Sequence, residues 1–205
     1  MRLATLFLRT ALLCAVSLTL ASTAQSGVPS PANSTHDPCF VTCPLGDITY
    51  HVTVRDVANV PVVNSMVTLD FSQCAFVHCP LQGPGIIVSD AAKTMTAFTG
   101  ATGVASFPLA MGGCCPTVGI FADNVFLATV SMTSPDQNAS LLVNGADLSI
   151  VTGLVGSANA CADLDCSGAV NAADVGIVTA HNGHSCTGVV PTRSSTWGTL
   201  KSIYR

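Results

Sequence analysis

The stretch ADLDCSGAVNAADVGIVTAHNG, residues 162–183, places carboxylate and amide side chains directly ahead of an apolar run. Counted from residue 163, side-chain oxygens fall at positions 1, 3, 5, 9 and 12, and Gly168 stands at position 6. A hard divalent cation takes roughly six to eight oxygen ligands, which a loop wrapped around it supplies from alternate residues. The spacing therefore predicts a Ca²⁺ loop that leads into a helix. The predicted ligands are Asp163, Asp165, Ser167, Ala169 through its carbonyl, Asn171 and Asp174.

A second copy of this pattern lies 27 residues upstream. VNGADLSIVTGLVG (143–156) aligns with VNAADVGIVTAHNG (170–183) at 8 of 14 positions without a gap, which indicates two copies of one loop–helix unit. The upstream loop has two carboxylates and Leu141 at position 6, so we expect weaker binding there. The alternative is a pair of Asx-rich turns that cap two helices. The predicted upstream ligands are Asp136, Asn138, Ser140, Leu142 through its carbonyl, Asn144 and Asp147.

The segments ahead of the two loops do not favour a helix. An EF-hand needs a helix that enters the loop, whereas TSP and SANACA precede positions 136 and 163. The paired pattern D-x-[DN]-x-S…V-N-x-x-D-[LV]-x-I-V, over residues 134–186, instead resembles a type I dockerin. The resemblance implies two Ca²⁺ ions, two antiparallel helices near residues 147–155 and 174–181, and docking onto a cohesin-like or other exported protein.

The resemblance departs from the family where a partner would be recognised. The family commonly has hydroxyl-bearing residues after position 9, but this chain has Gly145 and Ala146 in one copy and Ala172 and Ala173 in the other. Cysteines 161, 166 and 186 are also additional to the family pattern. A match to a cellulosomal cohesin therefore does not follow from the resemblance.

Residues 39–133 have the pattern of short strands. DITYHVTVRD (47–56) alternates apolar and polar side chains, and PVVNSMVTLDFS, GIIVSD, KTMTAFT and GVASFPL continue the series between turns. VTVRDVANVPVVNSMVTLDFS followed by TGATGVASFPL resembles bacterial Ig-like and carboxypeptidase-regulatory-like repeats. The predicted fold class is thus a mainly β, Ig-like antiparallel sandwich over residues 39–133, followed by a small α-helical dockerin-like domain over residues 134–187.

The N-terminal end of the chain predicts export. Arg2 and Arg9 precede an apolar run at residues 11–20 and small residues up to Ala24, as in a secretory signal peptide over residues 1–24. Residues 25–38 are expected to form a linker, and no later apolar run is long enough for a membrane span. The tail, residues 188–205, could dock on the body, bind a partner or act as a sorting signal. We expect a secreted protein, extracellular or at the cell surface.

The cysteines agree with export. Nine remain after the signal peptide, a density that favours disulfides, and the odd number leaves one thiol free or paired between molecules. The sequence contains no CxxC pair, so a zinc ribbon is not indicated. The connectivity stays open; the local pairs considered are Cys74 with Cys79, and Cys186 with Cys161 or Cys166. The adjacent Cys114 and Cys115 are expected to enter separate disulfides.

The remaining residues predict a non-catalytic protein. Seven Lys and Arg with no basic run argue against nucleic-acid binding, and no GxSxG, HExxH or phosphate-loop motif occurs. His181 and His184 could suit a metal, although a solvated helix end is favoured. The predicted function is Ca²⁺-dependent protein–protein attachment or assembly. The alternatives are a carbohydrate-related accessory role, as a cellulosome-like subunit or glycan binder in polysaccharide catabolism, and a cryptic hydrolase.

Overall fold

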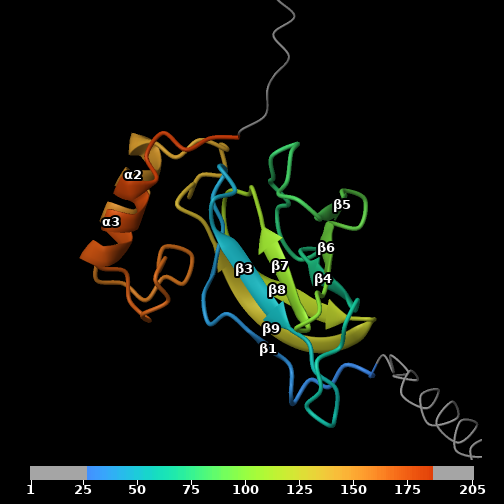
Figure 1. The fold of residues 1–205 in the computed structure, drawn as a ribbon. Helices are drawn as coiled ribbons and strands as arrows, with labels where there is room; N and C mark the ends of the chain where they lie inside the picture. Colours follow the sequence, from blue (N-terminus) through green and yellow to red (C-terminus); the bar gives the residue numbers. More distant parts are fainter. Residues whose placement is uncertain (1–26, 187–205) are drawn as a thin grey trace, which may run out of the picture.

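The computed structural model describes residues 27–186, and the predicted signal peptide and C-terminal tail lie outside this range. Within it the chain forms nine strands and two helices (Figure 1). The segment predicted as a linker contributes the first strand, and strand structure stops at Thr133, close to where the sequence predicted that it would. The elements are β1 (Thr35–His36), β2 (Phe40–Val41), β3 (Thr49–Thr53), β4 (Met66–Asp70), β5 (Ile87–Ser89), β6 (Thr94–Phe98), β7 (Val104–Pro108), β8 (Cys115–Ala122), β9 (Val125–Thr133), α2 (Gly145–Gly153) and α3 (Ala172–Ala180).

The strands form two sheets that share one core. A three-stranded sheet has the order β1-β3-β7, and a six-stranded sheet has the order β2-β9-β8-β4-β6-β5 and curls into a half-barrel (Figure 1). Alternation along β3 buries Tyr50 and Val52 while Thr49 faces solvent. Tyr50 stacks on Phe40 of β2 with ring centroids 4.1 Å apart, so the two sheets are joined through aromatic contacts.

The two helices begin at matching capping boxes. Asn144 and Asn171 are the N-caps, and the N3 carboxylates of Asp147 and Asp174 accept from the N-cap backbone N–H groups. Both helices therefore start two residues earlier than the sequence predicted, because the cap is the Asn of each repeat rather than the Asp. They lie side by side next to the sheets, and each is nine residues long (Figure 1).

The predicted fold class is wrong. The described chain is mostly β, with two sheets and only two short helices, and it shows no clear Ig sandwich followed by a dockerin-like helical pair. One reason is that β2 pairs in parallel with β9, a long-range pairing that period-two patterns do not specify. Another is that the helices share their core with the N-terminal part of the chain. That core contains Cys43, Leu45, Ile48, Val143, Val151, Ala162, Leu164, Val170 and Val178.

Three of the four disulfides tie the helical units to the β region, and the fourth, Cys74–Cys115, lies within the β region. The expected separation of Cys114 and Cys115 is confirmed, but both local pairs considered from the sequence are wrong. The sulfur atoms join across sequence separations of 41 to 127 residues, and Cys43 is buried and free. Multiple disulfides are typical of secreted or extracellular proteins. The bonds are Cys39–Cys166, Cys74–Cys115, Cys79–Cys186 and Cys114–Cys161.

No helix within residues 27–186 is long and apolar enough to cross a membrane.

Candidate metal centres

The loop over residues 163–174 is closed by backbone amides that bind its first and last carboxylates. Asp163 Oδ2 accepts from the Gly168 backbone N–H at an N···O distance of 2.7 Å. Asp174 accepts from the backbone N–H of Leu164 at 2.6 Å and of Asn171 at 2.8 Å. Because each carboxylate receives several N–H groups, both side chains are held in place by the loop's own backbone.

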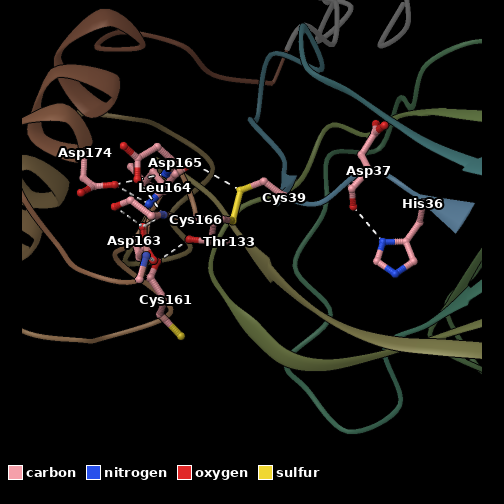
Figure 2. The surroundings of a disulfide bond; sticks show 12 residues. His36, Asp37, Cys39, Thr133, Cys161, Asp163, Leu164, Asp165, Cys166 and Asp174 are labelled. Carbon is pink, nitrogen blue, oxygen red and sulfur yellow. Dashed lines mark hydrogen bonds between the residues drawn. A yellow bond between two sulfur atoms is a disulfide. The ribbon is translucent and has the colours of Figure 1, made fainter.

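Three carboxylates gather inside this loop. Asp163, Asp165 and Asp174 each place an oxygen within 4.8 Å of the others. Asp163 and Asp174 are buried, whereas Asp165 is exposed and its pKa is lowered, chiefly by a hydrogen bond from Ser167. Figure 2 shows the three side chains together beside the Cys39–Cys166 disulfide. An array of acidic oxygens at this spacing suits a hard divalent cation.

The other predicted ligands of this loop lie next to one another. Ser167 Oγ donates to the Ala169 carbonyl at 3.2 Å, and Asn171 Nδ2 donates to the same carbonyl at 3.1 Å. The Asn171 side-chain oxygen accepts from the Ala173 N–H at 2.7 Å and so caps α3. The structure therefore brings loop positions 5, 7 and 9 together, with the position-9 oxygen directed at the helix N-terminus.

The upstream loop repeats most of this geometry, although the bond from the Leu164 N–H to Asp174 has no upstream counterpart. Asp136 accepts from the Leu141 N–H at 2.7 Å, the same distance as its counterpart has to Gly168. Asp147 accepts from the Asn144 N–H at 2.9 Å. Burial raises the pKa of Asp136 above its ordinary value. The remaining predicted ligands also lie together, with Ser140 N–H donating to Asn138 Oδ1 at 3.0 Å and Ser140 Oγ to the Leu142 carbonyl at 3.1 Å.

The buried carboxylates of the two loops have no basic partner among the described residues. Arg55 and Lys93 are the only Lys or Arg between residues 27 and 186, and each donates to a backbone carbonyl elsewhere. Burying a carboxylate away from a counter-charge costs several kcal/mol, of the order given by charge desolvation. Backbone N–H groups offset part of this cost, and a bound cation would offset more. The four side chains are Asp136, Asp147, Asp163 and Asp174.

Hydrogen bonds at the end of β9 also position the second loop. The Thr133 hydroxyl and the Gln137 amide both donate to the carbonyl of Cys161, the latter at 2.8 Å. Cys161 is itself joined to Cys114, the residue immediately before β8. The segment that enters the second loop is thus attached directly to the six-stranded sheet.

A second group of possible ligands includes two residues that the sequence analysis missed. Cys43, Asp47, His181 and His184 each offer one ligand atom, and these atoms lie within 4.8 Å of one another. The two histidines were predicted to form a solvated helix end, but their side chains are only 19% and 27% exposed. The odd number of cysteines after the predicted signal peptide was the one feature of the sequence that indicated a free thiol such as Cys43.

The Cys43 thiol does not have the properties of a nucleophile in this structure. Its side chain is fully buried, and burial raises the pKa of the thiol to about 12. A catalytic cysteine needs a lowered pKa and access to its substrate. Burial and the raised pKa of its thiol therefore argue against a nucleophilic role for Cys43.

No match to this chain is found among family models, curated proteins or solved structures. The resemblances to dockerins and Ig-like repeats stay predictions that rest on residue patterns alone.

Proposed function

We propose that this chain is an exported, non-catalytic protein whose two loop–helix units bind one Ca²⁺ each and support attachment to another exported protein. The observation that carries the proposal is the convergence of Asp163, Asp165 and Asp174 oxygens within 4.8 Å, without a basic side chain beside them in the described part of the chain. Loop spacing predicted from the sequence agrees with this convergence.

The donor set favours Ca²⁺ over other ions. All predicted ligands are carboxylate, amide, hydroxyl or carbonyl oxygens, which suit hard cations. Mg²⁺ demands a smaller octahedral site and retains several waters, whereas a loop that offers about six protein oxygens fits the larger ion. The second loop has three carboxylates and the first has two, so we expect the second site to bind more tightly.

The role of the ion is structural in this proposal. Asp147 and Asp174 are at once the last predicted ligand of each loop and the N3 residue of each capping box. An ion bound there links the loop to the first turn of its helix. Free Ca²⁺ at a concentration of about one hundred times the dissociation constant would stabilise the folded state by about 2.7 kcal/mol.

The attachment surface that we propose is the exposed start of α3. The start of α2 offers a similar patch at the opposite end of the helix pair, because Val143 is hydrogen-bonded to His184 and Gly156 to Val170. Gly145, Ala146, Ala172 and Ala173 are all exposed and carry no long side chain. Ile150 on α2 is 38% exposed. Such a small-residue surface lets a partner's side chains approach the helix backbone closely, and Ca²⁺ in the preceding loop would hold the first turn of the helix in place.

The carbohydrate alternative receives less support. Stacking on a sugar ring with a polar handle for its hydroxyls calls for an exposed Tyr or Trp, but Tyr50 is buried in the core at 2% exposure. The exposed aromatic side chains of the described residues are Phe98 and Phe126, which have no polar group. Trp197 and Tyr204, the other Trp and Tyr, lie outside the described residues.

The test of Ca²⁺ binding is calorimetric titration of the chelator-treated, disulfide-intact chain from residue 25 onward. We expect two binding events, and a melting temperature that falls in chelator and recovers with Ca²⁺. Asp174→Asn should abolish the tighter event and Asp147→Asn the weaker one. Asp90→Asn, at an exposed carboxylate outside the loops, is the matched control. Two unaffected events in Asp174→Asn, or no binding by the unmodified chain, would refute the site assignment.

Attachment is tested by capture of exported proteins on the immobilised chain, in Ca²⁺ and in chelator. We expect a Ca²⁺-dependent partner that is lost in Ala173→Arg, because the long charged side chain would cover the proposed surface. Asp90→Asn should retain the partner. Equal capture by the Ala173→Arg variant would place attachment elsewhere on the molecule.

A further inference from the structure

We propose that Cys43, Asp47, His181 and His184 form a structural Zn²⁺ site, separate from the two Ca²⁺ loops and not required by their proposed function. The four residues come from two segments that are distant in sequence, the turn after β2 and the end of α3. Nothing in the twelve-residue loop pattern uses any of them.

The distances between the ligand atoms fit a tetrahedral ion. Zinc bonds of about 2.0 to 2.3 Å give ligand-to-ligand distances of about 3.3 to 3.8 Å. Cys43 Sγ lies 3.5 Å from His184 Nδ1. Asp47 Oδ2 lies 3.4 Å from His184 Nδ1 and 3.9 Å from His181 Nε2. Two of the six edges thus fall within the expected range, a third is slightly longer at 3.9 Å, and all six are below 4.8 Å.

The hydrogen bond of His181 prepares its other ring nitrogen for a metal. His181 Nδ1 lies 2.9 Å from the Ile177 carbonyl oxygen, which can only accept, so Nδ1 carries the proton. In the neutral ring Nε2 then presents a lone pair to the Asp47 carboxylate, and two acceptors face each other. A cation between them removes this conflict. Metal-binding histidines commonly make this backbone hydrogen bond through the second ring nitrogen.

The backbone holds both ligand segments in place. The Gly46 N–H donates to the Cys43 carbonyl at 2.8 Å, closing the turn that brings Asp47 back toward the thiol. The His184 carbonyl accepts from the Val143 N–H at 2.9 Å. The disulfide of Cys186 to Cys79 fixes the chain two residues beyond His184. A site supported in this way needs little rearrangement when an ion enters.

Charge and accessibility favour Zn²⁺ over other ions. One thiolate and one carboxylate neutralise a divalent ion, which suits a partly buried position. Sulfur and imidazole ligands are typical of zinc and disfavour Ca²⁺ and Mg²⁺, while four protein ligands leave no open position for catalysis. Cys43 is fully buried, whereas the Asp47 side chain is 35% exposed and offers the ion a path from solvent.

The test uses Co²⁺ as a spectroscopic probe on the intact, oxidised chain from residue 25 onward, stripped of metals and then supplied with excess Ca²⁺. We expect a thiolate-to-cobalt charge-transfer band, intense visible bands of tetrahedral Co²⁺, and loss of both on adding one equivalent of Zn²⁺. His184→Gln should lower the Co²⁺ affinity by at least about tenfold. Cys43→Ser should remove the charge-transfer band.

Two controls separate this site from the rest of the molecule. His36→Gln alters an exposed histidine outside the cluster and should bind Co²⁺ as the unmodified chain does. Asp174→Asn should leave the cobalt spectrum unchanged, so failure of the Ca²⁺ proposal and failure of the Zn²⁺ proposal remain distinguishable. Circular dichroism checks that each variant is folded. Absence of the charge-transfer band in the unmodified chain, or its persistence in Cys43→Ser, would overturn the proposal.

Discussion

Leu141 and Gly168 occupy the same position in the two repeated loops, and both have a left-handed backbone, with φ of +62° and +92°. The turn is therefore retained in both copies although only one has the residue that adopts it without strain. A left-handed backbone costs an L-residue about 1–2 kcal/mol relative to glycine. The first loop carries this cost, and the second avoids it.

Replacing Gly168 with Ala should lower the free energy of unfolding by about 1 kcal/mol, because a Cβ disfavours the left-handed conformation. Gly176→Ala, in the middle of α3, should raise it by about 0.5–1 kcal/mol, because Gly is a poor helix former. A Cβ would meet no atom within 4 Å at either position, so the contrast isolates backbone conformation. Urea unfolding in chelator measures both, and a shift of the same sign in both would contradict the loop geometry.

Leu141→Gly should have the opposite effect in the first loop. Removing the strained side chain is expected to raise the free energy of unfolding by up to about 1 kcal/mol, less what the half-buried leucine contributes by packing. In an Asp174→Asn background the same change should also tighten Ca²⁺ binding by the first loop, as measured by calorimetry. Weaker binding would show that Leu141 is needed for the loop.

Tyr50→Phe is expected to stabilise the protein. The Tyr50 hydroxyl is buried and has no hydrogen-bond partner among the described residues, so its removal should raise the free energy of unfolding by about 1 kcal/mol. Tyr50→Ala removes the stack on Phe40 as well and should lower it by about 3–5 kcal/mol. Urea unfolding at neutral pH gives both values. A destabilised Phe variant would mean that the hydroxyl has a partner in solution.

The same substitution predicts a change in pH dependence. Burial, with a smaller contribution from Asp37, raises the pKa of Tyr50 well above the ordinary value of a tyrosine. The folded state therefore holds this proton more tightly than the unfolded state, and stability falls as the pH rises above about 10. Tyr50→Phe should make the alkaline part of the stability curve shallower, and an unchanged slope would contradict the burial of the phenol.

The disulfide pattern predicts a single free thiol in the chain from residue 25 onward. Peptide mapping without reduction should recover the bonds Cys39–Cys166 and Cys79–Cys186, together with the other two. An alkylating reagent should label Cys43 slowly in the native, metal-free protein and fully in urea, because the thiol is buried. Cys43→Ser should then show no labelling in urea, and a Cys74–Cys79 linkage would contradict the structure.

Local features of this protein were determined by the sequence alone. The spacing from Asp163 to Asp174 predicted the loop, and the last carboxylate of each loop predicted the helix start to within two residues. Alternation around Tyr50 predicted β3 and its buried face. Each of these signals lies within about twelve residues, where backbone geometry and side-chain period act directly. The structure agrees with the sequence here because the interacting groups are neighbours along the chain.

Long-range pairing was decided only by the tertiary structure. Cys39 is bonded to Cys166 across 127 residues, and β2 pairs in parallel with β9. No local sequence pattern predicts either pairing. Cys43 and Asp47 likewise become part of a possible metal site only because the fold brings His184 next to them. Such contacts depend on how sheets and helices stack to bury a shared core, and that packing is a property of the whole chain. For this reason the loops could be predicted from residue spacing, whereas the fold class and the cysteine–histidine cluster could not.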